Sequence, residues 1–316
     1  MDEIIKREET APAAAAALSF PELFRRFLAS PFKCESTKLT YARALKQFGI
    51  WTDANAPAGP LKSESIWEFK RALVARGLSP LTVNSYLAAV KKFFSWTEGA
   101  GIYPNIARGI EPEGRERDVF YKDNLTLDQA RGLLKAVKVR TVKGKRDFAI
   151  INLMIQTGLR TIEIRRANVG DMVNQGNATV LHVQGKGKKD KAKYVVLTPA
   201  TLAPIHSYLK TRGAVRPDAP LFAAISNRNL NGRMTTKSIS RLIKAAIEKI
   251  APGNPRLTAH SLRHTAVTFA LLGGASVQET QAFARHADIN TTLIYAHNIE
   301  RIAAVPEKAI AAFLKG

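Results

Sequence analysis

One stretch of the sequence divides the chain, because residues 104–124 lack the sustained apolar period that the regions on either side show. This stretch contains Pro104, Gly109, Pro112 and Gly114, and a mixed-charge run from Glu113 to Asp118. Prolines and glycines at this density interrupt helices and strands. At 316 residues the chain is long enough for two domains that each bury a core. We therefore expect two domains joined by a linker over residues 109–124.

Four helix starts precede this linker, each marked by serine, which is a preferred N-cap residue. They lie at Ser19-Phe20-Pro21, at Ser36, at Ser63-Glu64 with a stop at Gly77, and at Ser79-Pro80. Proline suits the first helical position because its missing N–H would have no partner there. Residues 1–15 end in an alanine run and lack a periodic apolar pattern anchored by large side chains, which predicts a flexible tail. The sequence thus predicts a four-helix domain over residues 16–108.

The fourth of these helices is amphipathic, since apolar side chains recur in it at helical spacing. They are Val83, Leu87, Val90 and Phe94. Lys91 and Lys92 fall on the other side and are candidates for contact with nucleic acid. A solvated charged surface explains each lysine alone equally well, so repetition of basic positions across the domain is what favours nucleic acid.

The second domain is predicted over residues 125–300, mainly helical with one small antiparallel sheet, which makes it α+β. Thr126 and Gln129 have the spacing of a capping box, and a buried helix is expected over 148–155. Two strand patterns follow at 179–183 and 194–197, with a turn at Gly185-Lys186-Gly187 between them. Helical patterns then return through to Leu314.

The charge of the chain limits the partners it can bind. Lys and Arg total 48 against 26 Asp and Glu, a formal charge of +22 that a polyanion would neutralise. Charge alone leaves DNA, RNA and an anionic membrane surface open, but no apolar run approaches the ~20 residues that span a bilayer. The mixed-charge start, MDEIIKREET, differs from a secretory signal, and the single cysteine, Cys34, excludes an intramolecular disulfide. We expect a cytoplasmic protein that binds nucleic acid.

Six residues have side chains suited to chemistry on a phosphate, although each alone has a structural explanation. They are Arg160, Lys186, His260, Arg263, His286 and Tyr295. Arg160 follows a helix stop at Gly158 and could simply pair with Glu163. Lys186 lies in a lysine-rich hairpin with Lys188, Lys189, Lys191 and Lys193, where most lysines are mobile phosphate contacts.

His260 and Arg263 are three residues apart in the first turn of a helix capped by Thr258, so both project from one face. The start of a helix favours an anion because its free N–H groups point outward. We interpret the next residue, His264, as a core or supporting residue. A tyrosine in a helix, such as Tyr295, is usually a packing residue.

In combination, the six residues resemble a known family. Arg160 in Thr-Gly-Leu-Arg, Lys186 in Gly-Lys-Gly, His260-x-x-Arg263, His286 and Tyr295 in Ile-Tyr-Ala-His follow the order and spacing of the tyrosine recombinases of the lambda-integrase and Xer type. The resemblance covers residues 125–300, and residues 16–108 are similar to the family's core-binding domain. The chain departs from the family at Arg285, where glycine is common, and in a hairpin that is richer in lysine after Gly187.

The resemblance implies a mechanism. Tyr295 would attack the phosphorus, release a 5′ hydroxyl and remain as a 3′ phosphotyrosine. Arg160 and Arg263 would hold the non-bridging oxygens through forked donors, with a further hydrogen bond from His286. His260 is the candidate base and Lys186 the candidate acid, with Lys188 or Lys189 as alternatives for the acid. No metal or nucleotide cofactor is implied.

The implied partners are double-stranded DNA recombination sites and three further copies of the chain in a tetramer. Residues 301–316 would dock on a neighbouring protomer, and accessory DNA-bending or directionality proteins are further candidate partners. Two other functions remain open from the sequence. One is a DNA-binding regulator with a vestigial active site, and the other is a type IB topoisomerase or telomere resolvase with related chemistry.

Overall fold

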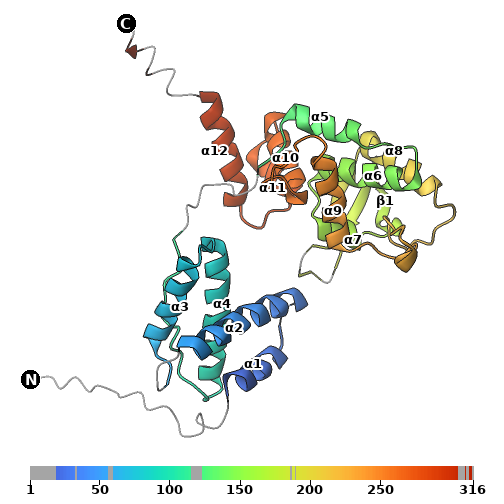
Figure 1. Ribbon diagram of the computed structural model, residues 1–316. Helices are drawn as coiled ribbons and strands as arrows, with labels where there is room; N and C mark the ends of the chain where they lie inside the picture. The colour runs from blue at the N-terminus through green and yellow to red at the C-terminus, as the bar shows by residue number, and fades with distance from the viewer. Residues whose placement is uncertain are drawn as a thin grey trace, which may run out of the picture. The chain divides into compact units, whose positions relative to one another are not determined.

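The computed structural model describes residues 19–32, 34–55, 60–114, 123–185, 187–188, 190–304, 310 and 313–314. The chain divides into two compact units, residues 1–117 and 118–316, which are coloured blue to cyan and green to red in Figure 1. The predicted tail over residues 1–15 lies outside the described residues. So do residues 115–122 of the predicted linker.

The described residues of the first unit form four helices: α1 (Phe20–Ala29), α2 (Glu35–Asn55), α3 (Ser63–Ala75) and α4 (Pro80–Gly99). Ser19 and Ser79 occupy the predicted N-cap positions of α1 and α4. The other two starts lie earlier than predicted, by two residues for α2, in which Ser36 is already inside the helix, and by one residue for α3. Helix α2 already begins at Glu35, and the N-cap of α3 is Lys62, whose backbone N–H donates to the Ser65 hydroxyl at 3.3 Å.

Phenylalanine side chains from all four helices meet in the core of the first unit. Edge-to-face pairs join α1, α2, α3 and α4, with ring centroids 4.9–6.0 Å apart in Phe24–Phe93, Phe48–Phe69 and Phe48–Phe94. Such pairs add about 0.5–1.5 kcal/mol each beyond the area they bury. Of the two lysines on α4 that the sequence singles out, Lys92 is exposed, whereas Lys91 donates from Nζ to the Ile110 carbonyl.

The second unit is mainly helical, as predicted. Its helices are α5 (Leu127–Ala136), α6 (Val142–Thr157), α7 (Thr161–Arg166), α8 (Pro199–Lys210), α9 (Thr236–Ile247), α10 (Ala259–Leu272), α11 (Val277–Ala284) and α12 (Asn290–Ala304). The short 3-10 helices η2 and η3 span Val169–Asp171 and Asn227–Asn229. Thr126 and Gln129 form the predicted capping box at the start of α5.

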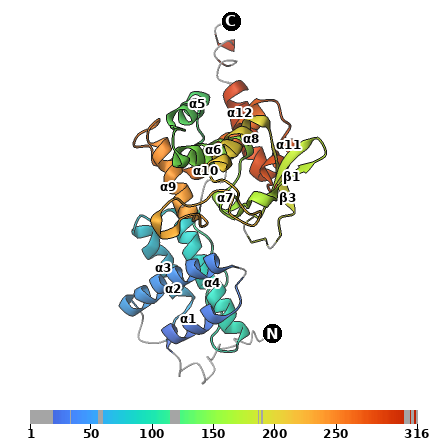
Figure 2. The same ribbon diagram turned by 90° about the vertical axis from the view of Figure 1, so that its right-hand side faces the viewer.

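One three-stranded antiparallel sheet interrupts the helices of this unit. Its strands are β1 (Met172–Gln175), β2 (Ala178–Val183) and β3 (Lys193–Leu197), in the order β1-β2-β3. The two predicted strands are β2 and β3, with Leu181 opposite Val195. Helices α6 and α8 pack together beside β3, as Figure 2 shows. The predicted fold class, mainly helical with a small antiparallel sheet, is confirmed.

The core of the second unit surrounds α6, which is buried along most of its length. Helices α6 and α10 pack against each other, and α10 also contacts α11 and α12. These contacts bring the loops that end α6 and α11 next to the start of α10. Across the described part of the chain, no helix combines the length and the apolar character that crossing a membrane requires.

Gly144, in the first turn of α6, lies so close to the backbone of a neighbouring segment that a larger residue would clash with it. A Cβ added there would lie 1.9 Å from the carbonyl oxygen of Lys138. Since backbone rather than a flexible side chain is in the way, we predict that Gly144→Ala lowers the free energy of unfolding by about 3 kcal/mol. Denaturant-induced unfolding followed by circular dichroism measures the change.

Gly132 in α5 provides the matched control. A Cβ added there would meet Ile250 Cγ2 at 3.6 Å, an ordinary contact, and alanine is the better helix former by about 1 kcal/mol. We therefore expect Gly132→Ala to leave stability unchanged or to raise it. Equal destabilisation by the two substitutions would contradict the role given to Gly144.

Candidate active site

Arg160 lies where α6 ends and α7 begins. Helix α6 stops at Gly158 in the left-handed conformation (φ +61°), which suits glycine because it has no Cβ. The extended Arg160 then caps α7, and its backbone N–H donates to Glu163 Oε2 at 2.8 Å. Nη1 of Arg160 also contacts Glu163 Oε1 at 3.3 Å. The pairing with Glu163 that the sequence allowed is thus present, and it leaves Arg160 half-buried beside the start of α10.

Arg263 joins the ends of two helices. Its side chain is 2% exposed, and it donates from Nη1 to the Gly158 carbonyl at 2.6 Å and from Nη2 to the Ala284 carbonyl. These carbonyls lie at the carboxyl ends of α6 and α11, where helix dipoles favour a cation. Burial lowers the pKa of Arg263 to about 9, helped by repulsion from Arg160 and Arg285. The group therefore remains charged at neutral pH.

His286 lies in the turn between α11 and α12. Its Nδ1 is 2.8 Å from the buried hydroxyl of Thr292, which fixes the orientation of the ring. Burial, together with the charges of Arg263 and Arg160, lowers the pKa of His286 to about 4. The ring is therefore neutral at pH 7.

Tyr295 projects from α12 into a small apolar cluster with Val267 and Ala284. Its side chain is buried, with the residue 6% exposed, and its hydroxyl is hydrogen-bonded to Nδ1 of His264. Burial raises the pKa of Tyr295 to about 12, although the nearby guanidinium groups of Arg263 and Arg160 act in the opposite direction. A neutral, buried phenol of this kind needs activation before it can act as a nucleophile.

The two histidines of α10 lie one helical turn apart. The ring centroids of His260 and His264 are 4.6 Å apart, and that of His264 is 5.5 Å from that of Tyr295. His264 is thus the supporting residue that the sequence suggested, and its contact is with the candidate nucleophile. Burial lowers the pKa of His264 to about 4, with His260 and Arg263 adding to the effect. The i, i+4 spacing of the two histidines was the available indication that both face the site.

The β2–β3 hairpin begins beside Glu163. A Cβ built on Gly185 would lie 4.0 Å from Glu163 Oε1, and Arg166 Nη1 donates to the Gly185 carbonyl at 2.7 Å. Lys186 and Lys189 lie outside the described residues. Lys188 is exposed, whereas Lys191 pairs with Asp171 at 2.5 Å. The hairpin therefore starts next to the candidate site.

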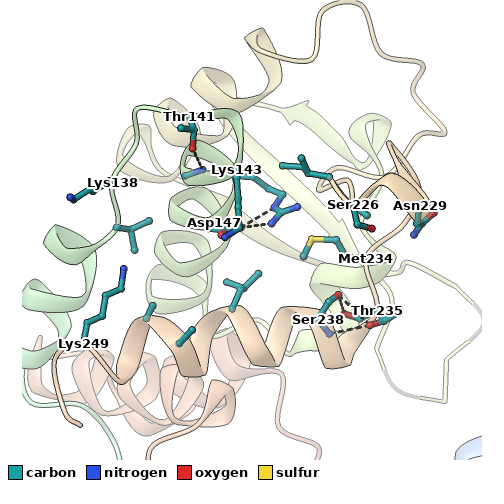
Figure 3. Close-up of a pocket in the computed structure, with 18 residues that line it drawn as sticks. Lys138, Thr141, Lys143, Asp147, Ser226, Asn229, Met234, Thr235, Ser238 and Lys249 are labelled. Carbon is teal, nitrogen blue, oxygen red and sulfur yellow. Dashed lines mark hydrogen bonds and ion pairs between the residues drawn. The ribbon is translucent and has the colours of Figure 1, made fainter.

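A pocket of about 790 Å³ lies elsewhere in this unit, between the start of α6, α9 and the segment before α6 (Figure 3). Lysines 138, 143 and 249 line it, together with the ion pair between Arg146 and Asp147 at 2.6 Å. None of the described candidate residues lines this pocket. In the described ranges, His, Cys, Asp and Glu side chains form no group of three or more that could hold a metal ion.

Comparison with known proteins identifies the family. Residues 123–301 match the Phage integrase family, which covers more than half of the chain. The chain is 29% identical to the tyrosine recombinase XerC of Pelobacter propionicus, over 86% of this chain and 88% of that protein. It is 30% identical to the tyrosine recombinase XerD of Caulobacter vibrioides, over 74% of this chain and 76% of that protein.

Solved structures share the fold. The XerH site-specific recombinase in a post-cleavage complex with its palindromic difH substrate superposes with a TM-score of 0.73, at 19% identity, over 92% of this chain and 86% of that one. A lambda integrase dimer bound to a COC′ core site gives a TM-score of 0.66 at 15% identity, over 87% of this chain and 97% of that one. The chain belongs to the phage integrase family of tyrosine recombinases, and it is a site-specific recombinase that breaks and rejoins DNA.

The lowered pKa values of the two histidines predict how stability depends on pH. His264 and His286 are neutral in the folded chain down to about pH 4, whereas an unfolded histidine takes up its proton near pH 6.5. The unfolded state therefore binds more protons between these values. The stabilisation is complete above pH 6.5 and is lost as the pH falls towards 4. We predict a loss of about 1–2 kcal/mol per histidine from pH 7.5 to 5.

Urea unfolding at these two pH values measures the loss. His264→Asn, which keeps a hydrogen-bonding group but cannot titrate, should remove about half of the pH dependence. His206→Asn, on the outer face of α8, is the control and should leave the pH dependence as it is. An unchanged pH dependence in His264→Asn would show that this histidine is not held neutral.

Proposed function

We propose that Tyr295 is the nucleophile that cleaves one DNA strand and that Arg160, Arg263 and His286 hold the scissile phosphate. The observation that carries this proposal is the convergence of these side chains from the ends of α6 and α11, the start of α10 and the middle of α12. Residues up to 135 positions apart in sequence meet within one cluster. A helix-packing role for Tyr295 alone would not require two arginines and two histidines around it.

The charge balance of the cluster supports phosphate as its ligand. Arg160, Arg263 and Arg285 carry three positive charges, and Glu163 is the carboxylate that the described ion pairs place among them. Repulsion between the arginines contributes to the lowered pKa of Arg263. A phosphodiester anion would relieve this repulsion, and guanidinium forks match its two non-bridging oxygens.

In the proposed reaction, Tyr295 Oη forms a bond to the phosphorus while the bond from phosphorus to the 5′ oxygen breaks. The phenolic proton passes to His260, and Lys186 gives a proton to the departing 5′ oxygen. The product is a 3′ phosphotyrosine that conserves the energy of the phosphodiester. With Nδ1 of His286 engaged by Thr292, we assign Nε2 to the phosphate. The arginines provide charge stabilisation that metal ions provide in many nucleases, so we propose a reaction without metal or nucleotide cofactor.

Tyr295 has to leave its buried position to react. Its hydroxyl is bonded to His264 and has a pKa of about 12 because of burial. We infer that DNA binding breaks this contact and brings the hydroxyl towards the phosphate, where the arginines favour the phenolate. The chain without DNA would then hold its nucleophile in a less reactive state.

Strand exchange follows when the 5′ hydroxyl of another strand attacks the phosphotyrosine. We propose that two such exchanges proceed through a Holliday junction, in a tetramer of this chain on two DNA sites in the cytoplasm. Ile310, Phe313 and Leu314, in the predicted docking segment over residues 301–316, are exposed. Their burial against a neighbouring protomer is the interaction we propose for that segment.

Covalent trapping tests the assignment of Tyr295. The protein is mixed with nicked duplexes of random sequence around the nick, so that a short fragment diffuses away after cleavage and prevents religation. We expect wild type to give a protein–DNA complex that survives denaturing electrophoresis, and Tyr295→Phe to give none while still binding DNA. Sequencing the trapped DNA also gives the recognition site. DNA binding without any covalent product from wild type would identify a regulator with a vestigial site instead.

A sulfur-substituted substrate tests Lys186 as the acid. We expect Lys186→Ala to slow cleavage by roughly 10²–10⁴-fold, as loss of acid catalysis does. Sulfur in place of the bridging 5′ oxygen should restore most of this rate, because a thiol with a pKa near ~8.5 leaves without a proton. Lys188→Ala and Lys189→Ala are the controls, and sulfur substitution should not restore a lost cleavage rate in either of them. Rescue of one of these controls but not of Lys186→Ala would assign the acid to that lysine.

A further inference from the structure

Arg285 has a backbone conformation that is unusual for its residue type. It caps the carboxyl end of α11 in the left-handed region, with φ +56° and ψ +41°. Glycine is favoured at such positions because a Cβ crowds the backbone, and a larger residue costs on the order of 1 kcal/mol there. Glycine is also common at this position in the family that the chain resembles. The arginine side chain must therefore contribute interactions that glycine cannot make.

The guanidinium of Arg285 turns inward to the active site. Its side chain is 5% exposed and donates from Nη1 to the Phe283 carbonyl at 2.8 Å and from Nη2 to Glu163 Oε2 at 3.3 Å. Nη2 is also 3.5 Å from the Gly158 carbonyl, which accepts from Arg263 as well. Nε is buried without a hydrogen-bond partner among the described residues. The contacts made by the two Nη atoms thus place a buried cation beside Glu163.

Glu163 is shared by two arginines. One carboxylate oxygen contacts Arg160 Nη1 and the other contacts Arg285 Nη2, each at 3.3 Å. With its side chain 2% exposed, this carboxylate has lost most of its contact with water and attracts nearby cations strongly. Without Arg285, Arg160 would be the one guanidinium among the described ion pairs left to neutralise it. Its hold on Arg160 would then increase.

We propose that Arg285 is a positioning residue that neutralises Glu163 and thereby leaves the guanidinium of Arg160 available to the scissile phosphate. The inference rests on the proposed role of Arg160. In this proposal Arg285 acts through Glu163, the carboxylate that its Nη2 contacts at 3.3 Å. It also links the turn after α6, through Gly158, to the turn that carries His286.

Single-turnover cleavage of the trapped DNA sequence tests this role. We expect Arg285→Gly to slow covalent complex formation at saturating protein by roughly 10- to 100-fold, the loss that follows when a reacting group is misplaced. DNA affinity should change by less than about twofold, because the proposed role of the residue is exerted on Arg160 through Glu163 and not on DNA. Thermal stability should be retained, since glycine suits the left-handed backbone. Arg285→Lys, which restores the cation without the fork, should fall between wild type and Arg285→Gly.

The decisive measurement is suppression by a second substitution. In the Arg285→Gly background, Glu163→Gln removes the charge that holds Arg160, while the amide oxygen can still accept the Arg160 backbone N–H. We expect the double variant to cleave about tenfold faster than Arg285→Gly alone, and the same substitution to speed up Arg285→Lys. A double variant no faster than its parent would overturn the proposal. So would a parallel loss of DNA affinity in Arg285→Gly, which would mean direct contact with phosphate.

Failure of this inference can be told apart from failure of the proposed function. If wild type forms the covalent complex, Tyr295→Phe does not, and Arg285→Gly reacts at the wild-type rate, only the role of Arg285 is lost. If Tyr295→Phe also forms the complex, the assignment of the nucleophile is wrong. If Arg285→Gly unfolds, the comparison of Arg285→Lys with and without Glu163→Gln still decides the question.

Discussion

The buried guanidinium of Arg263 fixes how closely the carboxyl ends of α6 and α11 approach each other, and the geometry of the site depends on this contact. Two residues beyond the Gly158 carbonyl lies Arg160, and two beyond the Ala284 carbonyl lies His286. Arg263 therefore helps to set the positions of Arg160 and His286 through these two carbonyls. Helix ends are suited to this because their unpaired carbonyls accept hydrogen bonds from a cation. Replacing Arg263 would remove the contact that holds the two turns and, in the proposed reaction, a ligand of the phosphate.

The sequence predicted those structural features in and near the candidate site whose cause is local. The stop at Gly158, the cap at Thr126 and the pairing of Arg160 with Glu163 depend on residues within a few positions of each other. The contact between His264 and Tyr295 depends instead on how α10 packs against α12. Both histidines of α10 lie on the same face of the helix, so their spacing alone did not indicate which of them contacts Tyr295. The inward turn of Arg285 was equally out of reach, because it depends on a buried carboxylate 122 positions earlier.

The elements that the sequence predicted carry a local signal of their own, and strand β1, which it did not predict, lacks one. Serine and proline caps placed the starts of the helices in the first unit within two residues, because capping is a property of the first turn. Strands β2 and β3 carry buried apolar positions that give a readable pattern. Strand β1 has intermediate or exposed residues throughout, so it lacks the alternation that marks a half-buried strand. Its pairing with β2, rather than its own composition, makes it a strand.

The candidate site carries a cost in stability that the proposed binding of phosphate would explain. Three arginines gather around one buried carboxylate, and two histidines are held neutral although water would allow them to titrate normally. A second carboxylate in the cluster would relieve the repulsion, but it would also compete with DNA for the same guanidinium groups. We propose that the incomplete neutralisation keeps an anion site open, where a bound phosphate would supply the missing charge. Glu163 remains compatible with this arrangement because its charge is divided between Arg160 and Arg285.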